Sequence, residues 1–204
     1  VAKVFEAKGR PSFNPLIVHV SGIEMAESLG VLTQAARDLV ETVWPGPVSI
    51  VVPMREGTGL SRLATAGHAS VALRMPTGPV AQDLLRALNR PLAAPSANPS
   101  GRSSPTTAQH VLAGLDGKIA AVIDGGPCPS GLESTIIGFL DDQPRLLREG
   151  AYVPKDAGIQ RDTSPETSPI APGQLASHYA PSGQLRLNAT QANPDEFHIG
   201  FGPV

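Results

Sequence analysis

Short apolar runs alternate with helical patterns along most of the chain, and this alternation is the feature that most constrains the fold. Strand-like apolar runs bounded by turn residues occupy residues 15–20, 48–53, 70–75, 120–123, 134–140 and 144–148. Apolar residues at helical spacing occupy 33–44, 80–88 and 106–115, the first of them after a candidate N-cap at Thr33. A short apolar segment, 91–95, leads into a polar loop. Such alternation predicts an α/β domain with a mixed sheet.

The alternation ends near residue 150, and the predicted domain therefore spans residues 1–150. Residues 151–181 are rich in Pro, Ser, Thr and Asp with little periodicity, which predicts a linker. Residues 182–204 hold strand-like runs at 184–187 and 197–201 but are too few to bury a core, so we interpret them as the start of a second domain. The pattern is already strand-like at Val1, with no initiator Met, so we expect the natural protein to begin upstream.

Charge and cysteine content exclude several classes of protein. A net charge of −2 argues against a basic surface for non-specific nucleic-acid binding. Cys128 is the only cysteine, which excludes an internal disulfide or a thiolate zinc cluster and favours a reducing compartment. No apolar run approaches the roughly 20 residues that cross a bilayer, so no membrane contact is expected. The 21 glycines and 21 prolines predict many turns and surfaces lined by backbone.

The first polar cluster is Lys8-Gly9-Arg10-Pro11, followed by Asn14. Placed at the end of a predicted strand, the two cations could hold phosphate oxygens, with arginine offering a bidentate fork. The alternative is a solvated basic turn.

The second cluster is a loop of small and hydroxyl residues, 94–101, continued by 103–107. Small residues let the backbone approach a ligand, and a helix N-terminus favours anions. The alternative is an ordinary strand–loop–helix connection with a Ser or Thr cap. The loop lacks the spacing of a P-loop and of a dinucleotide fingerprint.

The third cluster is Asp124-Gly125-Gly126 followed by residues 131–136, where a carboxylate and hydroxyls open a strand. A glycine-rich hairpin is the alternative. His19 in an apolar strand could be a core residue, and Arg74 at a strand end could form a surface ion pair. No Ser/His/Asp order, metal-ligand spacing or carboxylate pair stands out, and we expect no role for Cys128.

Together the clusters resemble the threonylcarbamoyl-AMP synthase family, the YrdC-like proteins. The resemblance depends on Lys8 and Arg10 paired with the distant Ser96 and Asn98, and on Gly131-Leu132-Glu133-Ser134-Thr135. It covers about residues 1–150. Beyond it, 171–174 and 177–181 resemble the segment between the domains of the longer members, which folds over the active site. The resemblance thus implies a long, two-domain form whose upstream threonine-site segment and most of whose Rossmann-like C-terminal domain lie outside this chain.

The family resemblance implies a twisted open mixed sheet with a large concave, positively charged cavity. It implies that L-threonine, bicarbonate and ATP give threonylcarbamoyl-AMP and pyrophosphate, with Mg²⁺ held mainly by ATP phosphates. Carried over by position, the ATP-binding residues are Arg10, Asn14, Ser70, Ser96, Ser104, Arg148 and Tyr179. The threonine-binding residues are His19, Arg74, Ala94 and Ser134. Lys8 and Arg10 would stabilise charge, and no residue has a covalent role.

The implied product serves threonylcarbamoylation of adenosine 37 in tRNA, so the expected partners include the cytoplasmic tRNA transfer machinery and a weak contact with RNA. Two alternatives stay open. One is a carbamoyl-transfer domain of the same fold. The other is a non-catalytic RNA-binding module, which the net charge and the 4% aromatic content disfavour.

Overall fold

The computed structural model describes residues 1–141, 143–154, 159–162, 169–174 and 186–197. Its elements are α1 (Ala2–Lys8), β1 (Ile17–His19), α2 (Ile23–Leu29), α3 (Gln34–Val43), β2 (Val48–Pro53), β3 (Ser70–Arg74), α4 (Pro79–Leu88), β4 (Leu92–Ala93), α5 (Ala108–Leu115), β5 (Thr135–Gly138), β6 (Arg145–Arg148) and β7 (Gln160–Arg161). The alternating order confirms the predicted α/β class.

The strands form one open sheet in the order β4-β1-β3-β2-β5-β6-β7. The pairs β1–β3, β2–β5 and β6–β7 are parallel. The pairs β1–β4, β2–β3 and β5–β6 are antiparallel. The sheet is therefore mixed, as predicted, and it leaves β4 and β7 as its two edges.

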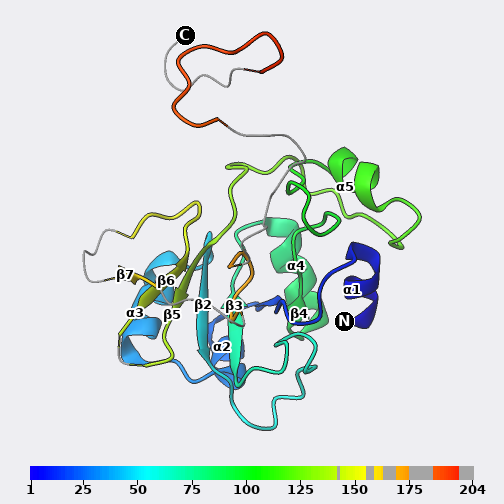
Figure 1. Cartoon of the computed structure of the whole chain (residues 1–204). Helices are drawn as coiled ribbons and strands as arrows, with labels where there is room; N and C mark the ends of the chain where they lie inside the picture. The colour runs from blue at the N-terminus through cyan, green and yellow to red at the C-terminus, as the bar shows by residue number, and fades with distance from the viewer. Residues whose placement is uncertain (142, 155–158, 163–168, 175–185, 198–204) are drawn as a thin grey trace.

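Side chains that alternate along the strands build two apolar layers, one on each face of the sheet. Val18, Ile50, Val52 and Leu73 pack in the larger cluster with residues of α2 and α3. Their strand neighbours Ile17, Val51, Ala72 and Ile136 form the smaller cluster, together with Ala171. Figure 1 shows α2 and α3 on one side of the sheet and α4 on the other, with α1 and α5 beyond it. Burial on both faces explains why the central strands are continuous apolar runs.

Local signals placed several elements correctly. The Thr33 hydroxyl accepts a hydrogen bond from the Ala36 amide at 3.2 Å and caps α3, which ends before Pro45 because proline cannot continue a helix. Similarly, the Thr107 hydroxyl caps α5 by accepting from His110 N at 3.3 Å. The helices predicted over 33–44, 80–88 and 106–115 are thus confirmed.

Three expectations about the elements are wrong. Residues 2–8 form a helix instead of a strand, and Gly9 ends it in the left-handed conformation at φ 59°. Residues 120–123 form no strand, and Ile123 is 64% exposed, so the hairpin alternative for the glycines after them fails as well. The apolar run is too short to decide its own structure without a strand partner. The sequence also did not indicate α2 or β7.

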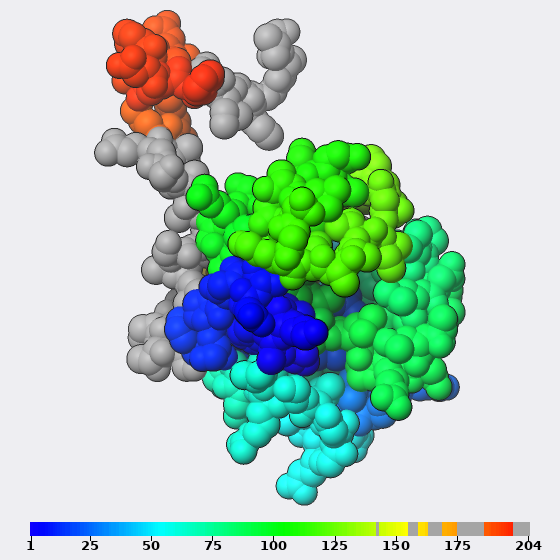
Figure 2. Space-filling model, turned by 90° about the vertical axis from the view of Figure 1, so that its right-hand side faces the viewer, coloured from blue at the N-terminus to red at the C-terminus, as the bar shows by residue number. Residues whose placement is uncertain are grey.

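The predicted linker adds an edge strand to the sheet through β7 and contributes the buried Ala171. Of the strand-like runs predicted beyond it, Arg186, Leu187 and Phe197 are not in strands, and the other residues of those runs lie outside the described part. Residues 186–197 stand apart from the sheet in Figures 1 and 2. None of the described helices has the length and apolar character needed to cross a membrane.

Candidate active site

Most of the residues singled out in the sequence meet at one end of the central strands of the sheet. The carboxyl ends of β1 and β3 lie side by side there, because parallel pairing sets His19 opposite Arg74. Since β2 is antiparallel to β3, the amino ends of β2 and its parallel partner β5 lie at the same end of the sheet. Arg148, at the carboxyl end of β6, pairs with Ile136 near the start of β5. Three strands thus deliver their last residues, and two their first, to a common site.

A cavity of about 200 Å³ opens at these strand ends. Its lining residues are Arg10, Ile17, His19, Arg74, Ala94, Pro95, Ser96, Glu133, Ser134, Arg148 and Pro172. All four residues predicted to hold threonine are among them. Three arginines face one carboxylate, so the cavity is positively charged and suits an anionic group.

A larger cavity of about 610 Å³ adjoins the first one. It runs between residues 104–111 and 122–134 and includes Ser104, Ile123 and Leu132. Four residues line both cavities: Arg74, Ser96, Glu133 and Ser134. The two spaces therefore meet at a polar junction, where molecules bound in each would touch.

Lys8 joins the helix α1 to the loop that carries Ser96. Its ammonium group donates hydrogen bonds to the backbone oxygens of Ser96 and Asn98, and to Asn98 Oδ1 at 3.2 Å. Its backbone oxygen accepts from Ser100 N at 2.8 Å, and Figure 2 shows the N-terminal segment (blue) lying against the green segment that follows this loop. Burial, and secondarily the charge of Arg10, lower the pKa of Lys8 to about 8, while Glu133 opposes the shift. Because all three protons of the ammonium have acceptors here, Lys8 acts first as a clamp on the loop.

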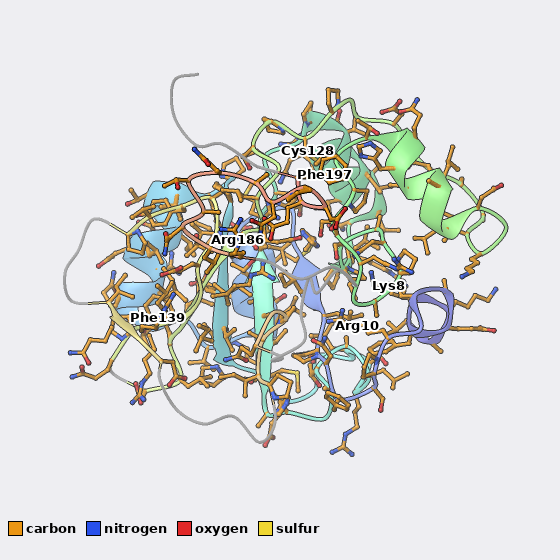
Figure 3. All side chains as sticks on the ribbon, turned by 45° about the horizontal axis from the view of Figure 1, so that its top comes forward. Lys8, Arg10, Cys128, Phe139, Arg186 and Phe197 are labelled. Carbon is orange, nitrogen blue, oxygen red and sulfur yellow. The ribbon has the colours of Figure 1, made fainter. Side chains whose placement is uncertain are left out.

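Arg10 holds the turn that leads into β1. Its Nε donates to Asn14 O at 3.0 Å, and one Nη donates to Asn14 Oδ1 at 2.7 Å and to Pro15 O at 2.6 Å. Asn14 is buried and lines neither cavity, so its described contact with the site runs through Arg10. Figure 3 shows Lys8 and Arg10 on the α1 side of the sheet, with Phe139 on the other side.

Glu133 is the acidic residue at the junction, and the sequence reasoning assigned it no role. Its carboxylate accepts a hydrogen bond from Ser104 Oγ and lies 4.0 Å from an Arg148 Nη. Arg148 in turn donates to Ser134 O, to Ser134 Oγ and to Pro172 O. One network thus ties Ser104 of the larger cavity to Ser134 of the smaller one. The signal available in the sequence was that Glu133 is the only acid in the 131–136 stretch.

Burial lowers the pKa values of both His19 and Arg74. Desolvation, with the charge of Arg74 second, lowers the pKa of His19 from 6.5 to about 4. Its Nδ1 is buried without a hydrogen-bond partner among the described residues. Burial and then Arg148 lower the pKa of Arg74, which Glu133 partly opposes, and Arg74 Nε donates to Gly46 O at 3.1 Å. His19 is therefore neutral at pH 7, beside a guanidinium.

Three of the residues predicted for the nucleotide, Asn14, Ser70 and Tyr179, are not placed at either cavity, and two, Arg10 and Arg148, line only the smaller one. Ser70 begins β3, about 13 Å along the strand from Arg74, and lines neither cavity. Tyr179 lies outside the described residues. Cys128 is exposed on the wall of the larger cavity. No group of three or more His, Cys, Asp or Glu side chains that could hold a metal ion occurs in the described part of the chain.

A family model described as "Sua5_yciO_yrdC: Telomere recombination" matches residues 1–150, which is more than half of the chain. The chain belongs to the Sua5/YciO/YrdC family. This confirms the resemblance drawn from the paired Lys8/Arg10 and Ser96/Asn98 motifs.

Curated relatives and a solved structure of the family agree with that assignment. The chain is 43% identical over 199 residues to "Threonylcarbamoyl-AMP synthase" of Bacillus subtilis, covering 92% of this chain and 56% of the relative. It is 41% identical to the protein of that name from Pyrococcus abyssi, covering 91% and 57%. The crystal structure of P. abyssi Sua5 complexed with L-threonine superposes with a TM-score of 0.84 at 39% identity, covering 90% of this chain and 56% of the other. The chain therefore spans a little over half the length of these relatives.

Proposed function

We propose that this protein is an L-threonylcarbamoyladenylate synthase, a nucleotidyltransferase that converts L-threonine, bicarbonate or CO₂ and ATP into threonylcarbamoyl-AMP and pyrophosphate. The observation that carries the proposal is the junction of the two cavities at Arg74, Ser96, Glu133 and Ser134. The smaller, arginine-lined space suits an amino acid, and the larger one has room for a nucleotide. The names of the B. subtilis and P. abyssi relatives support the same reaction.

In the smaller cavity, Arg74 would hold the threonine carboxylate. Ser134 would line the threonine pocket, Ala94 would contribute backbone, and neutral His19 would contact the amino acid without adding charge. In the larger cavity, Ser96 and Ser104 would contact ATP. Arg10 and Arg148, which line the smaller cavity, would reach the phosphates at the junction and offset their negative charge. We also propose that Asn14, Ser70 and Tyr179 belong to the nucleotide side, as the family resemblance implies.

The chemistry needs alignment more than a protein nucleophile. The threonine ammonium first loses a proton. Its nitrogen then bonds to the carbon of CO₂ with loss of a second proton, or to the carbon of bicarbonate with loss of water, and gives a carbamate. A carbamate oxygen then bonds to the α-phosphorus of ATP while the bond from that phosphorus to the bridging oxygen breaks, and pyrophosphate leaves. Both reactants are anions, so the three arginines of the smaller cavity would lower the barrier by holding them in contact. Lys8 contributes by fixing the loop that carries Ser96.

We further propose that Mg²⁺ accompanies ATP, with phosphates and water as its main ligands, where it would neutralise phosphate charge. The product would pass to the machinery that threonylcarbamoylates adenosine 37 in tRNA, with at most a weak contact to RNA. ATP, bicarbonate and tRNA meet in the cytoplasm, so we expect the protein to act there.

A pyrophosphate-release assay tests the proposal. Release should require ATP, L-threonine and bicarbonate together, and omission of any one should abolish it. Release that is indifferent to threonine would refute the proposal, and carbamoyl phosphate replacing threonine and bicarbonate would favour the carbamoyl-transfer alternative. Tight, salt-sensitive RNA binding without turnover would favour the RNA-binding module.

A further inference from the structure

A pair of buried serine hydroxyls lies at the cavity junction. Ser49, in the middle of the sheet on β2, is wholly buried and lines neither cavity. Its Oγ lies 2.8 Å from the Oγ of Ser134, which lines both. Parallel pairing brings them together, because Ser49 is in register with Ile136, two residues beyond Ser134. Nothing in the sequence singles out Ser49, which sits within the apolar run 48–53.

Arg148 donates hydrogen bonds to both the backbone oxygen and the hydroxyl oxygen of Ser134. Its Nε and one Nη donate to Ser134 O at 3.0 and 2.8 Å, and the same Nη donates to Ser134 Oγ at 3.0 Å. A guanidinium has only donors, so Ser134 Oγ must be the acceptor in that contact. This fork holds both the backbone and the side chain of Ser134 in place.

The proton between the two serines can then be assigned by counting donors and acceptors. If Ser134 donated to Ser49, the hydroxyl proton of Ser49 would have no acceptor, since Ser49 Oγ has no other hydrogen-bond partner among the described residues. An unsatisfied buried hydroxyl is costly. If Ser49 donates to Ser134, the Ser49 proton is satisfied, and the remaining proton of Ser134 is free to turn toward the cavities. In the second arrangement the proton without a protein acceptor lies at the wall of the two cavities, where water or a ligand can accept it.

We infer that Ser49 is a positioning residue, which holds Ser134 as a hydrogen-bond donor aimed into the cavity junction. The inference rests on the proposed function, and it deepens it by naming the ligand group at this point. A donor cannot pair with the ammonium of an amino acid, which also has only donors. Of the two charged groups of the amino acid, Ser134 can therefore pair only with the carboxylate, and Arg74 lines the same two cavities.

Substitution of Ser49 by an isosteric pair tests this role. Ser49→Thr keeps the hydroxyl, and Ser49→Val has the same shape without it, so any cost of the added methyl group is common to both. Calorimetric titration should show L-threonine binding to Ser49→Val about tenfold more weakly than to Ser49→Thr, because the Ser134 hydroxyl then lacks the donor that holds its own proton toward the cavity. The affinity for ATP should be the same in the two variants. If Ser49→Val does not fold, Ser49→Ala gives the same comparison against wild type.

Equal threonine affinity in the two variants would overturn the inference while leaving the proposed function intact. Equal losses of threonine and ATP affinity in Ser49→Val would also overturn it, since they would show a general packing defect. A wild-type protein that binds ATP but not threonine would instead refute the proposed function, and the inference with it.

Discussion

Acidification should destabilise the protein through His19 before most carboxylates titrate. The pKa of His19 is lowered to about 4 in the folded protein, against 6.5 for an unperturbed histidine, because the imidazole is buried and lies near Arg74. As the pH falls through this window, the unfolded chain binds a proton that the folded protein does not. The free energy of unfolding therefore falls as the pH falls from 6.5 toward 4.

The pKa values give the size of the effect. Proton linkage at this one site is negligible at pH 7.5 and reaches about 2 kcal/mol at pH 5. That loss is a substantial fraction of the roughly 5–15 kcal/mol that stabilises a typical domain. The substitution His19→Gln removes the titrating group, so the variant should lack this part of the pH dependence.

Urea denaturation at pH 7.5 and pH 5 measures the effect in wild type and His19→Gln. Wild type should lose about 2 kcal/mol more than the variant between the two conditions. His110→Gln, which changes an exposed imidazole on α5, is the matched control and should follow wild type. If wild type and His19→Gln lose the same free energy, the account of a buried neutral imidazole is wrong.

Two further substitutions test how the site is held. Lys8→Met leaves three loop acceptors without their donor, so it should lower the free energy of unfolding by about 2–4 kcal/mol and weaken ATP binding in a titration. Lys3→Met changes an exposed side chain on the same helix and should alter both quantities little. Equal effects of the two substitutions would contradict the role of Lys8 as a clamp. Gly150→Ala would put a Cβ 2.5 Å from the carbonyl carbon of Ser134 and should lower the free energy of unfolding, measured by urea denaturation, by about 1–3 kcal/mol. Gly125→Ala, whose nearest contacts are at 3.9 Å, should be tolerated. An unchanged stability of Gly150→Ala would show that this segment can shift.

The elements that the sequence predicted correctly carry their own signals. Helix α3 has a threonine cap at one end and a proline just beyond the other, and β2 is a β-branched run buried on both faces. Residues 120–123 have a similar apolar character but no strand partner, so they form part of a cavity wall instead. A strand exists only if another strand accepts its hydrogen bonds, and a run of four residues does not contain that information.

The candidate site shows the same division. Its charged and hydroxyl residues were identified from two separated motifs, because their residue types suit phosphate and carboxylate ligands. Glu133 was noted only as part of a third cluster, without a role, and Ser49 was not noted, since a serine in an apolar run has no distinguishing local pattern. Their importance appears only when β2 and β5 pair and bring Ser49 to Ser134, 85 positions away in the chain.

By itself the sequence determined the α/β alternation, the family of the chain and most of the side chains that face the two cavities. Only the tertiary structure decided that Lys8 is occupied as a clamp, that His19 is neutral, and that Ser134 turns a proton toward the junction. The physical reason is that residue type fixes which groups can donate, accept or carry charge. Burial and partners, supplied by segments distant in sequence, determine which of those capacities remain for a ligand.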